Sequence, residues 1–148
     1  GEYKPKKSIQ TISNAMDVSD PSNFIRIQKL FNNDLFGLKK SVTAYSYSDK
    51  QTEKAIREIY KLKNYIIDPH GAIGYLGLND FINSKTDPEN FQGLFLETAH
   101  PIKFSKTIEN IINQKIQIPK EIKNILKKKK ISIPIKDYNQ LKSFLIAK

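Results

Sequence analysis

Two short segments place chemically capable side chains where an apolar run gives way to a helix start. The first is Glu-Thr-Ala-His-Pro at residues 97–101, which follows Leu-Phe-Leu, and the second is Asp-Pro-His-Gly at residues 68–71, which follows Tyr-Ile-Ile. Ligand sites in open α/β sheets lie where strands end and helices begin. Side chains at both corners can therefore face a ligand.

Thr98 and His100 in the first corner each have two interpretations. The hydroxyl of Thr98 could satisfy a backbone donor at a strand end. It could instead exchange a hydrogen bond with a ring nitrogen of a ligand without adding a charge, whereas a carboxylate there would keep a pyridine ring protonated. His100 could be a general base or a packed structural histidine. The sequence alone leaves these alternatives open.

The second corner is explained by helix capping, with Asp68 as the N-cap and Pro69 at the first helical position. The alternative is that this helix N-terminus, with His70 beside it, faces an anionic group. No third ligand with metal-binding spacing accompanies the two histidines of the chain, so a metal site is not expected.

A third segment, residues 11–18, gathers short polar side chains after an apolar-polar alternation. Ordinary turn formation accounts for much of this composition. Ser13 and Asn14 are also suited to holding a phosphate or a carboxylate.

Strand-like and helix-like patterns alternate along the chain and must position these segments. Alternation and β-forming residues predict strands at 8–13, 41–47 and 93–97, and a short buried strand or extended stretch at 65–67. Helical spacing and capping signals predict helices at 21–37, 48–60, 69–82, 104–112, 119–129 and 137–147. Asp20 is the predicted N-cap of the first of these, and the helix at 69–82 is apolar enough to be buried. Such alternation indicates an α/β layer with a largely parallel sheet, left incomplete so that some other segment must cover it.

Composition narrows the class of protein. The chain has 148 residues, no cysteine and no apolar run of about 20 residues, so we expect one domain without disulfides or a membrane helix. It begins without Met and reads as the middle of a longer protein.

The net charge of +10 suggests a nucleic-acid-binding module, but nearly all of the positive charge comes from scattered lysines rather than from arginines. The lysine run at 127–130 is read as a solvated helix end or, less readily, a polyanion contact.

Three motifs in register resemble the threonine synthase family over nearly the whole chain. They lie at residues 11–24, 68–75 and 97–104, and residues beyond about 131 are less distinctive. The resemblance implies the C-terminal part of a pyridoxal-phosphate enzyme of fold type II, the tryptophan-synthase-like fold. Residues 1–148 would then be an incomplete three-layer α/β catalytic domain, with a partial, mostly parallel sheet, flanking helices and a helical C-terminal extension at 114–148.

The resemblance also implies an activity and site residues. The family is a carbon–oxygen lyase acting on phosphates, which converts O-phospho-L-homoserine and water to L-threonine and phosphate in cytoplasmic threonine biosynthesis. Thr98 matches the hydroxyl residue that contacts the pyridine nitrogen of pyridoxal 5'-phosphate. The positions expected at the substrate or the active-site rim are Ser13, Asn14, Asp68, His70 and His100.

The family's Schiff-base lysine and its glycine-rich phosphate loop lie upstream of every motif in this chain. Lys103 belongs to the His-Pro segment and does not stand in the Schiff-base context. We therefore expect no catalytic residue here, and expect the chain alone to be inactive without the missing N-terminal part of the same protein. Alternatives are another lyase of the same fold, such as a dehydratase, and a basic nucleic-acid-binding module; a membrane or nucleic-acid partner is otherwise not expected.

Overall fold

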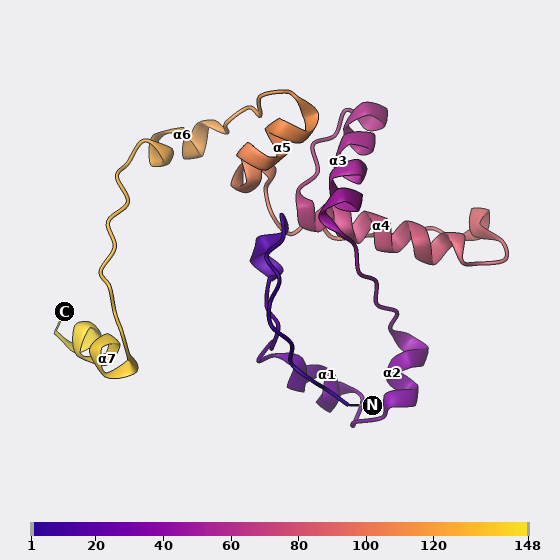
Figure 1. Cartoon of the computed structure of the whole chain (residues 1–148), viewed down its shortest axis with the longest axis horizontal. Helices are drawn as coiled ribbons and strands as arrows, with labels where there is room; N and C mark the ends of the chain where they lie inside the picture. The colour runs from indigo at the N-terminus through magenta and orange to yellow at the C-terminus, as the bar shows by residue number, and fades with distance from the viewer. Residues whose placement is uncertain (1, 148) are drawn as a thin grey trace. The chain divides into compact units, whose positions relative to one another are not determined.

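Residues 2–147 are described by a computed structural model and divide into two compact units, one through Ile116 and one from Gln117 onward (Figure 1). The first unit contains the α-helices α1 (Phe24–Leu30), α2 (Leu35–Ser41), α3 (Asp49–Lys63), α4 (Pro69–Asn83) and α5 (Ser105–Ile112), and the 3-10 helices η1 (Asn14–Met16), η2 (Pro88–Asn90) and η3 (Pro101–Phe104). The second unit contains α6 (Lys120–Leu126) and α7 (Tyr138–Ile146).

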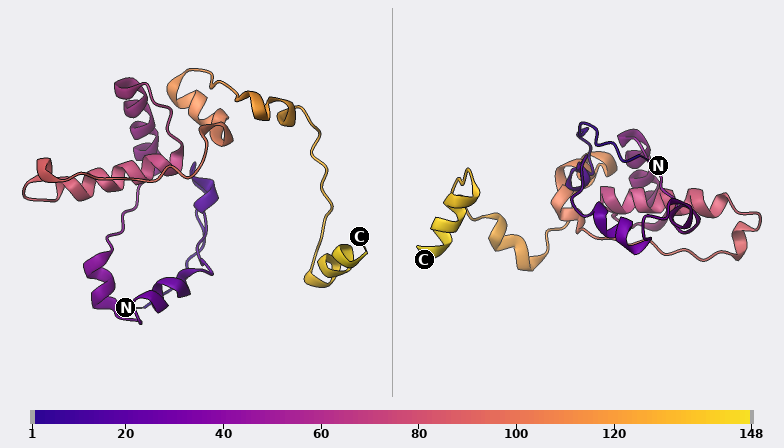
Figure 2. Two further views of the ribbon diagram at one scale, coloured as in Figure 1. Left: turned by 180° about the vertical axis from the view of Figure 1, so that it is seen from behind. Right: turned by 90° about the horizontal axis from the view of Figure 1, so that it is seen from below.

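The core of the first unit forms where α3 packs against α4 and α5. Its buried members are the aliphatic residues Ala55, Ile56, Ile59, Ile67, Ala72, Ile108, Ile111 and Ile116. The buried residues of α4 lie in its first turn, and Tyr75 and Leu76 pack against the core while partly buried. The later part of the helix extends away from α3 and α5 (Figures 1 and 2). The predicted burial of the whole helix is therefore wrong: Pro69, Gly71 and Ala72 are buried, whereas the later residues are half-buried or exposed.

Helix α3 begins at the predicted capping box and runs three residues beyond the predicted end at residue 60. The Ser48 side chain accepts from the backbone N–H of Gln51, and the Gln51 side chain accepts from the backbone N–H of Ser48, which makes a full capping box. At the other end Asn64 adopts the left-handed conformation with φ of 51°. The predicted helices near 69–82, 104–112, 119–129 and 137–147 are likewise confirmed, the last two with narrower bounds.

The extended segment 91–98 runs back along α4, with alternate side chains packed on the helix. Gly93 lies against Leu78, Phe95 against Gly74, and Glu97 against Gly71. The intervening residues Leu94 and Leu96 are 81% and 74% exposed. This period of two is that of a β-strand with one covered face.

No strand is present among residues 2–147, so the predicted partial sheet is not found and these residues are helical with extended connections. The reason is that a strand requires backbone pairing with a neighbouring strand. Residues 43–47 and 92–98 carry strand-like side-chain patterns, and both pack on α4: Tyr45 lies against Gly77 just as Phe95 lies against Gly74. In residues 2–147 neither segment has a backbone partner.

The single helix predicted over 21–37 is also wrong, because two helices occupy this stretch. Asn32 and Asn33 both adopt positive φ, at 49° and 58°, which no α-helix accommodates. Asp34 then caps α2 by accepting from the backbone N–H of Phe36 at 2.9 Å. The cap position of α1 is Asn23 rather than Asp20.

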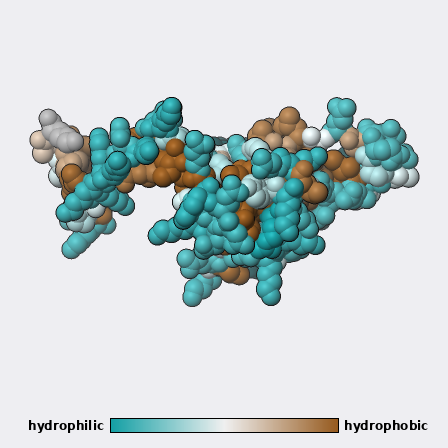
Figure 3. Space-filling view, turned by 90° about the horizontal axis from the view of Figure 1, so that it is seen from above, coloured by the Kyte–Doolittle hydropathy of each residue, from teal (hydrophilic) through white to brown (hydrophobic). Residues whose placement is uncertain are grey.

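Apolar side chains reach the surface between hydrophilic ones, as Figure 3 shows for one face. None of the helices in residues 2–147 has both the length and the apolar character needed to cross a membrane. The lysine run at 127–130 is exposed and follows α6 directly.

Candidate functional site

The two predicted corners lie together, joined by Glu97. The Glu97 carboxylate accepts a hydrogen bond from the backbone N–H of Asp68 (2.8 Å) and another from the phenol of Tyr65 (3.1 Å). It also packs on the first turn of α4, because a Cβ added at Gly71 would meet Glu97 Cδ at 3.0 Å. The end of segment 91–98 is therefore fixed to the start of α4.

Asp68 holds the first turn of α4 and His70 with a single oxygen. Its Oδ1 accepts from the backbone N–H of His70 (2.8 Å), as the capping interpretation predicts, and lies 2.8 Å from His70 Nδ1. Because a carboxylate only accepts, Nδ1 carries the proton in this contact. Asp68 is fully buried, and the side chain of His70 is 12% exposed and lies against the ring of Phe104.

Two buried polar atoms of this pair have no hydrogen-bond partner within residues 2–147: Asp68 Oδ2 and His70 Nε2. Buried polar groups are almost always paired in complete proteins, so each orphaned atom needs an explanation. A donor from a ligand or from another part of the protein would satisfy both. The corner therefore holds two buried polar atoms that residues 2–147 leave without a partner.

The ionisation of Glu97 reflects its surroundings. Burial raises the pKa of Glu97, and the nearby Asp68 carboxylate raises it further, while the hydrogen bond from the Asp68 backbone N–H lowers it. Sequence reasoning did not single out Glu97 or Tyr65 as site residues. In the sequence, Glu97 is only one residue of the 97–104 motif. No local pattern indicates its hydrogen bonds to Tyr65 and Asp68.

Thr98 and His100 lie on the exposed side of this junction. Thr98 follows Glu97 in an extended segment, so its side chain falls on the opposite face from the carboxylate. The backbone N–H of Ile102 donates to His100 Nδ1 at 3.1 Å, so His100 is the N-cap of η3. Because Nδ1 accepts this bond, the proton of a neutral imidazole lies on Nε2. Capping η3 is a structural role for His100, one of the two alternatives that the sequence left open.

Ser13 and Asn14 have different environments. Ser13 is 7% exposed, and its hydroxyl lies 3.0 Å from the hydroxyl of Thr11. Thr11 donates to Asp17 through both its hydroxyl (2.6 Å) and its backbone N–H (2.9 Å), which lowers the pKa of Asp17. Asn14 is exposed. Turn chemistry thus accounts for Thr11 and Ser13.

The segment around Ser13 is anchored toward the same region. The backbone N–H of Ile12 donates to Asp49 at the start of α3 (3.2 Å). His70 makes a smaller contribution to the lowered pKa of Asp17, so the two groups lie within electrostatic range. The structure therefore brings Asp68, His70, Glu97 and Thr98 into one junction, with the Ser13 segment near it.

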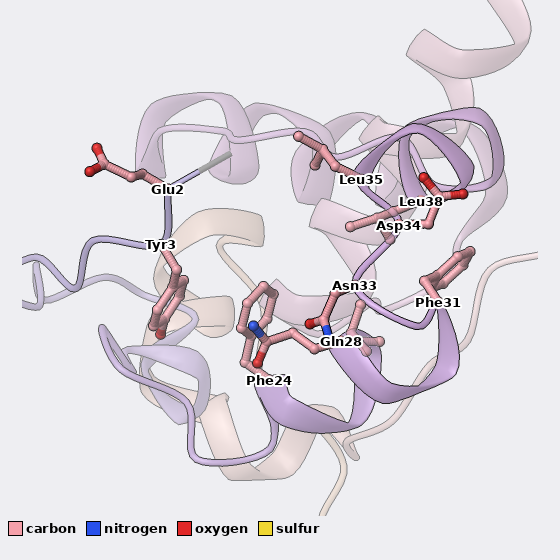
Figure 4. A pocket seen from close by; sticks show the side chains of 10 residues that line it. Glu2, Tyr3, Phe24, Gln28, Phe31, Asn33, Asp34, Leu35 and Leu38 are labelled. Carbon is pink, nitrogen blue, oxygen red and sulfur yellow. The ribbon is translucent and has the colours of Figure 1, made fainter.

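A separate cavity of about 300 Å³ lies between the N-terminal segment and helices α1 and α2. Figure 4 shows the stacked rings of Tyr3 and Phe24 on one side, with ring centroids 4.6 Å apart, and Leu35 and Leu38 from α2 on another. None of the predicted site residues lines it. Within residues 2–147 no cluster of three or more His, Asp or Glu side chains could hold a metal ion.

Known proteins resemble this chain at the level of sequence and of fold. A family model described as threonine synthase, C-terminal, matches residues 71–145. Threonine synthase from Buchnera aphidicola subsp. Acyrthosiphon pisum is 42% identical over the whole chain, and the chain covers 33% of that protein. The crystal structure of threonine synthase from Escherichia coli superposes with a TM-score of 0.82 at 32% identity, over 99% of this chain and 33% of that one.

A threonine synthase from Brucella melitensis solved with bound pyridoxal phosphate shares the fold, with a TM-score of 0.58 at 24% identity over 86% of this chain and 32% of that one. The chain thus spans about a third of the length of the relatives it matches. These relatives favour neither the dehydratase interpretation nor the nucleic-acid-binding one. The matched family range covers just over half of the sequence and includes Thr98 and His100. The chain therefore belongs to the threonine synthase C-terminal family.

Proposed function

We propose that this chain is the C-terminal part of an enzyme that converts O-phospho-L-homoserine and water to L-threonine and phosphate. The observation that carries the proposal is the match to threonine synthase from Escherichia coli along 99% of the chain, with a TM-score of 0.82. The activity is that of the whole enzyme. The chain contributes one wall of the site and not the complete site.

The cofactor of the proposed enzyme is pyridoxal 5'-phosphate, which supplies an electron sink when bound. The residues of this chain fit the ring of the cofactor but not its phosphate. Thr98 offers an exposed neutral hydroxyl, a suitable partner for an unprotonated ring nitrogen. The chain has 6 glycines but no glycine-rich loop of the kind that cradles a phosphate, so we assign the cofactor phosphate to the remainder of the protein. We assign the Schiff-base lysine there too, because no lysine of this chain stands in the family's Schiff-base context.

The other site residues are proposed to shape the rim. Asp68 and His70 present two unpartnered buried atoms at the start of α4, so they can receive donors from substrate or from the remainder of the enzyme. His100 fixes the turn after Thr98 by capping η3. Ser13 and Asn14 remain candidate substrate contacts, and of these only Asn14 is exposed.

The remainder of the same protein is the proposed partner of this chain. The exposed faces of Leu94 and Leu96, on a segment with strand-like alternation, support a neighbour that covers them. We also propose that residues 114–148 form a helical extension of the catalytic domain. The division of the chain between Ile116 and Gln117 supports a boundary close to that position.

The function is tested on the full-length protein. Purified with pyridoxal phosphate, it should release phosphate and L-threonine from O-phospho-L-homoserine, and it should not deaminate L-serine or L-threonine at a comparable rate. The matched control is the 148-residue chain alone, which should give no borohydride-trapped lysine adduct and no turnover. A full-length enzyme inactive on this substrate would contradict the proposal, and an active isolated chain would contradict the division of the site.

A further inference from the structure

Glu97 connects two parts of the junction that are far apart in the sequence, the end of segment 91–98 and residues 65–71. We propose that Glu97 is a positioning residue, whose carboxylate fixes the backbone at residue 97 against the start of α4 and thereby holds the Thr98 hydroxyl in one place. This inference rests on the proposed function, because the position of Thr98 matters only if a cofactor ring lies beside it.

The hydrogen bonds of Glu97 reach two elements of the same corner. One oxygen accepts from the backbone N–H of Asp68 at 2.8 Å, and the other accepts from the phenol of Tyr65 at 3.1 Å. Because each carboxylate oxygen has its own donor, rotation of the carboxylate would break at least one of the two bonds. One of these donors belongs to Asp68, which is fully buried and caps α4.

Packing restricts Glu97 as strongly as hydrogen bonding does. A Cβ at Gly71 would lie 3.0 Å from Glu97 Oε2 and 2.9 Å from a side-chain carbon of Ile67, so glycine leaves the space that the carboxylate occupies. Two residues earlier, Phe95 packs on Gly74 and lies edge-on to the ring of Tyr75. The covered face of the segment is thus fixed at successive positions up to Glu97.

Thr98 lies between two anchors. Glu97 fixes the residue before it, and His100 fixes the turn after it by accepting from the backbone N–H of Ile102 at 3.1 Å. Adjacent residues of an extended segment face opposite ways, so holding the Glu97 side chain against α4 directs Thr98 away from α4. A misplacement of about 1 Å at a reacting centre can cost about 100-fold in rate, so this restraint is large enough to matter.

The test uses the full-length, cofactor-loaded enzyme carrying Glu97→Ala, with Glu97→Gln as the conservative variant. Gln keeps an acceptor for the Asp68 N–H. The matched control is Glu109→Ala, because Glu109 also accepts from a backbone N–H (Ile116, 3.0 Å) and from a side chain (Lys115, 2.7 Å). Three measurements are made: kcat and KM, the absorbance spectrum of the bound cofactor, and hydrogen exchange at the Asp68 amide.

We expect Glu97→Ala to lower kcat by about tenfold with a smaller change in KM, to alter the cofactor absorbance, and to accelerate exchange at Asp68. Glu97→Gln should restore most of kcat and of the exchange protection. Glu109→Ala should leave all three measurements unchanged. If Glu97→Ala does not fold, Tyr65→Phe removes only the 3.1 Å bond from a half-exposed residue and should shift the same measurements in the same direction by less.

Two results would overturn the positioning role while leaving the proposed function intact. One is a loaded Glu97→Ala enzyme, or Tyr65→Phe in its place, with unchanged kcat and cofactor absorbance. The other is an equal loss in the Glu97→Ala and Glu109→Ala enzymes. An unsubstituted enzyme that neither binds pyridoxal phosphate nor turns over the substrate would instead overturn the proposed function, and this inference with it.

Discussion

Thr98 and Glu97 are neighbours in the sequence with opposite environments. Glu97 is half-buried against α4, and Thr98 is exposed on the other face. The sequence indicates Thr98 as a candidate site residue because it follows an apolar run. It does not indicate the importance of Glu97, because its partners Tyr65 and Asp68 become neighbours only through the return of segment 91–98 along α4.

A first prediction concerns the charge at residue 98. In the full-length enzyme Thr98→Asp should lower kcat by at least about 100-fold, because a carboxylate would keep the cofactor ring protonated, whereas a hydroxyl does not. In the 148-residue chain alone, where Thr98 is exposed, the same substitution should change the folding stability by less than about 0.5 kcal/mol. A pH titration of the cofactor absorbance checks the first effect, and thermal unfolding checks the second.

Thr98→Ser is the control for that experiment, because it keeps the hydroxyl and removes a methyl group. It should retain most of the activity and the unsubstituted titration curve. A Thr98→Asp enzyme with the same titration curve as the unsubstituted one would remove the assigned contact between this residue and the ring.

A second prediction concerns the phenol of Tyr47, which donates to Asp80 on α4 at 2.6 Å. Burial and the Asp80 carboxylate raise the pKa of Tyr47 from 10 to about 12. Between pH 10 and 12 the folded chain keeps this proton while the unfolded chain loses it, so this contribution to stability is present below pH 10 and lost as pH rises to about 12.

Urea unfolding at several pH values checks the Tyr47 prediction. Asp80→Asn removes the charge and keeps an acceptor, so the variant should lose less stability over this pH window than the unsubstituted chain does. The lysines titrate in both chains, so their effect on stability cancels when the two stability curves are compared. Parallel stability curves for the two chains would contradict the contact.

At the scale of elements, capping signals predicted helices far better than β-patterns predicted strands. The capping box at Ser48 and the cap at Asp68 are local, because donor and acceptor lie within three residues of each other. A strand depends on a distant partner, and alternation alone cannot create one. The break between α1 and α2 was missed because the apolar spacing continues across Asn32 and Asn33, whose positive φ ends the helix.

The cap of α4 gives a third prediction. Asp68→Ala should lower the free energy of unfolding by about 2 kcal/mol, the upper end for a helix cap, because the lost oxygen also holds buried His70. Asp68→Asn keeps the capping oxygen and should cost less. Asp20→Ala is the matched control: sequence reasoning makes Asp20 a cap, but the structure gives it only an exposed bond to Tyr3. Urea unfolding of the three variants checks this, and equal costs for Asp68→Ala and Asp20→Ala would contradict it.

At the scale of the whole molecule, the predicted α/β sheet is not found within residues 2–147. The sequence predicted that some other segment must cover an incomplete sheet. The chain spans a third of the matched relatives, and within residues 2–147 its strand-like segments pack on α4 without a backbone hydrogen-bond partner. Side-chain alternation predicts which face of a segment is covered, but it cannot supply the neighbouring strand that backbone pairing requires.

A fourth prediction follows from the difference between the chain and the longer protein. Leu96 is 74% exposed here, so Leu96→Asp should change the stability of the 148-residue chain by less than about 0.5 kcal/mol. In the full-length protein the same substitution should cost about 3 kcal/mol or more, because we propose that the remainder covers this face and a buried unpaired carboxylate is strongly unfavourable. Ile131→Asp, at a position 90% exposed in the second unit, is the control. Thermal unfolding of both proteins measures the contrast, and equal small effects of Leu96→Asp in both would show that this face stays open to solvent in the intact enzyme.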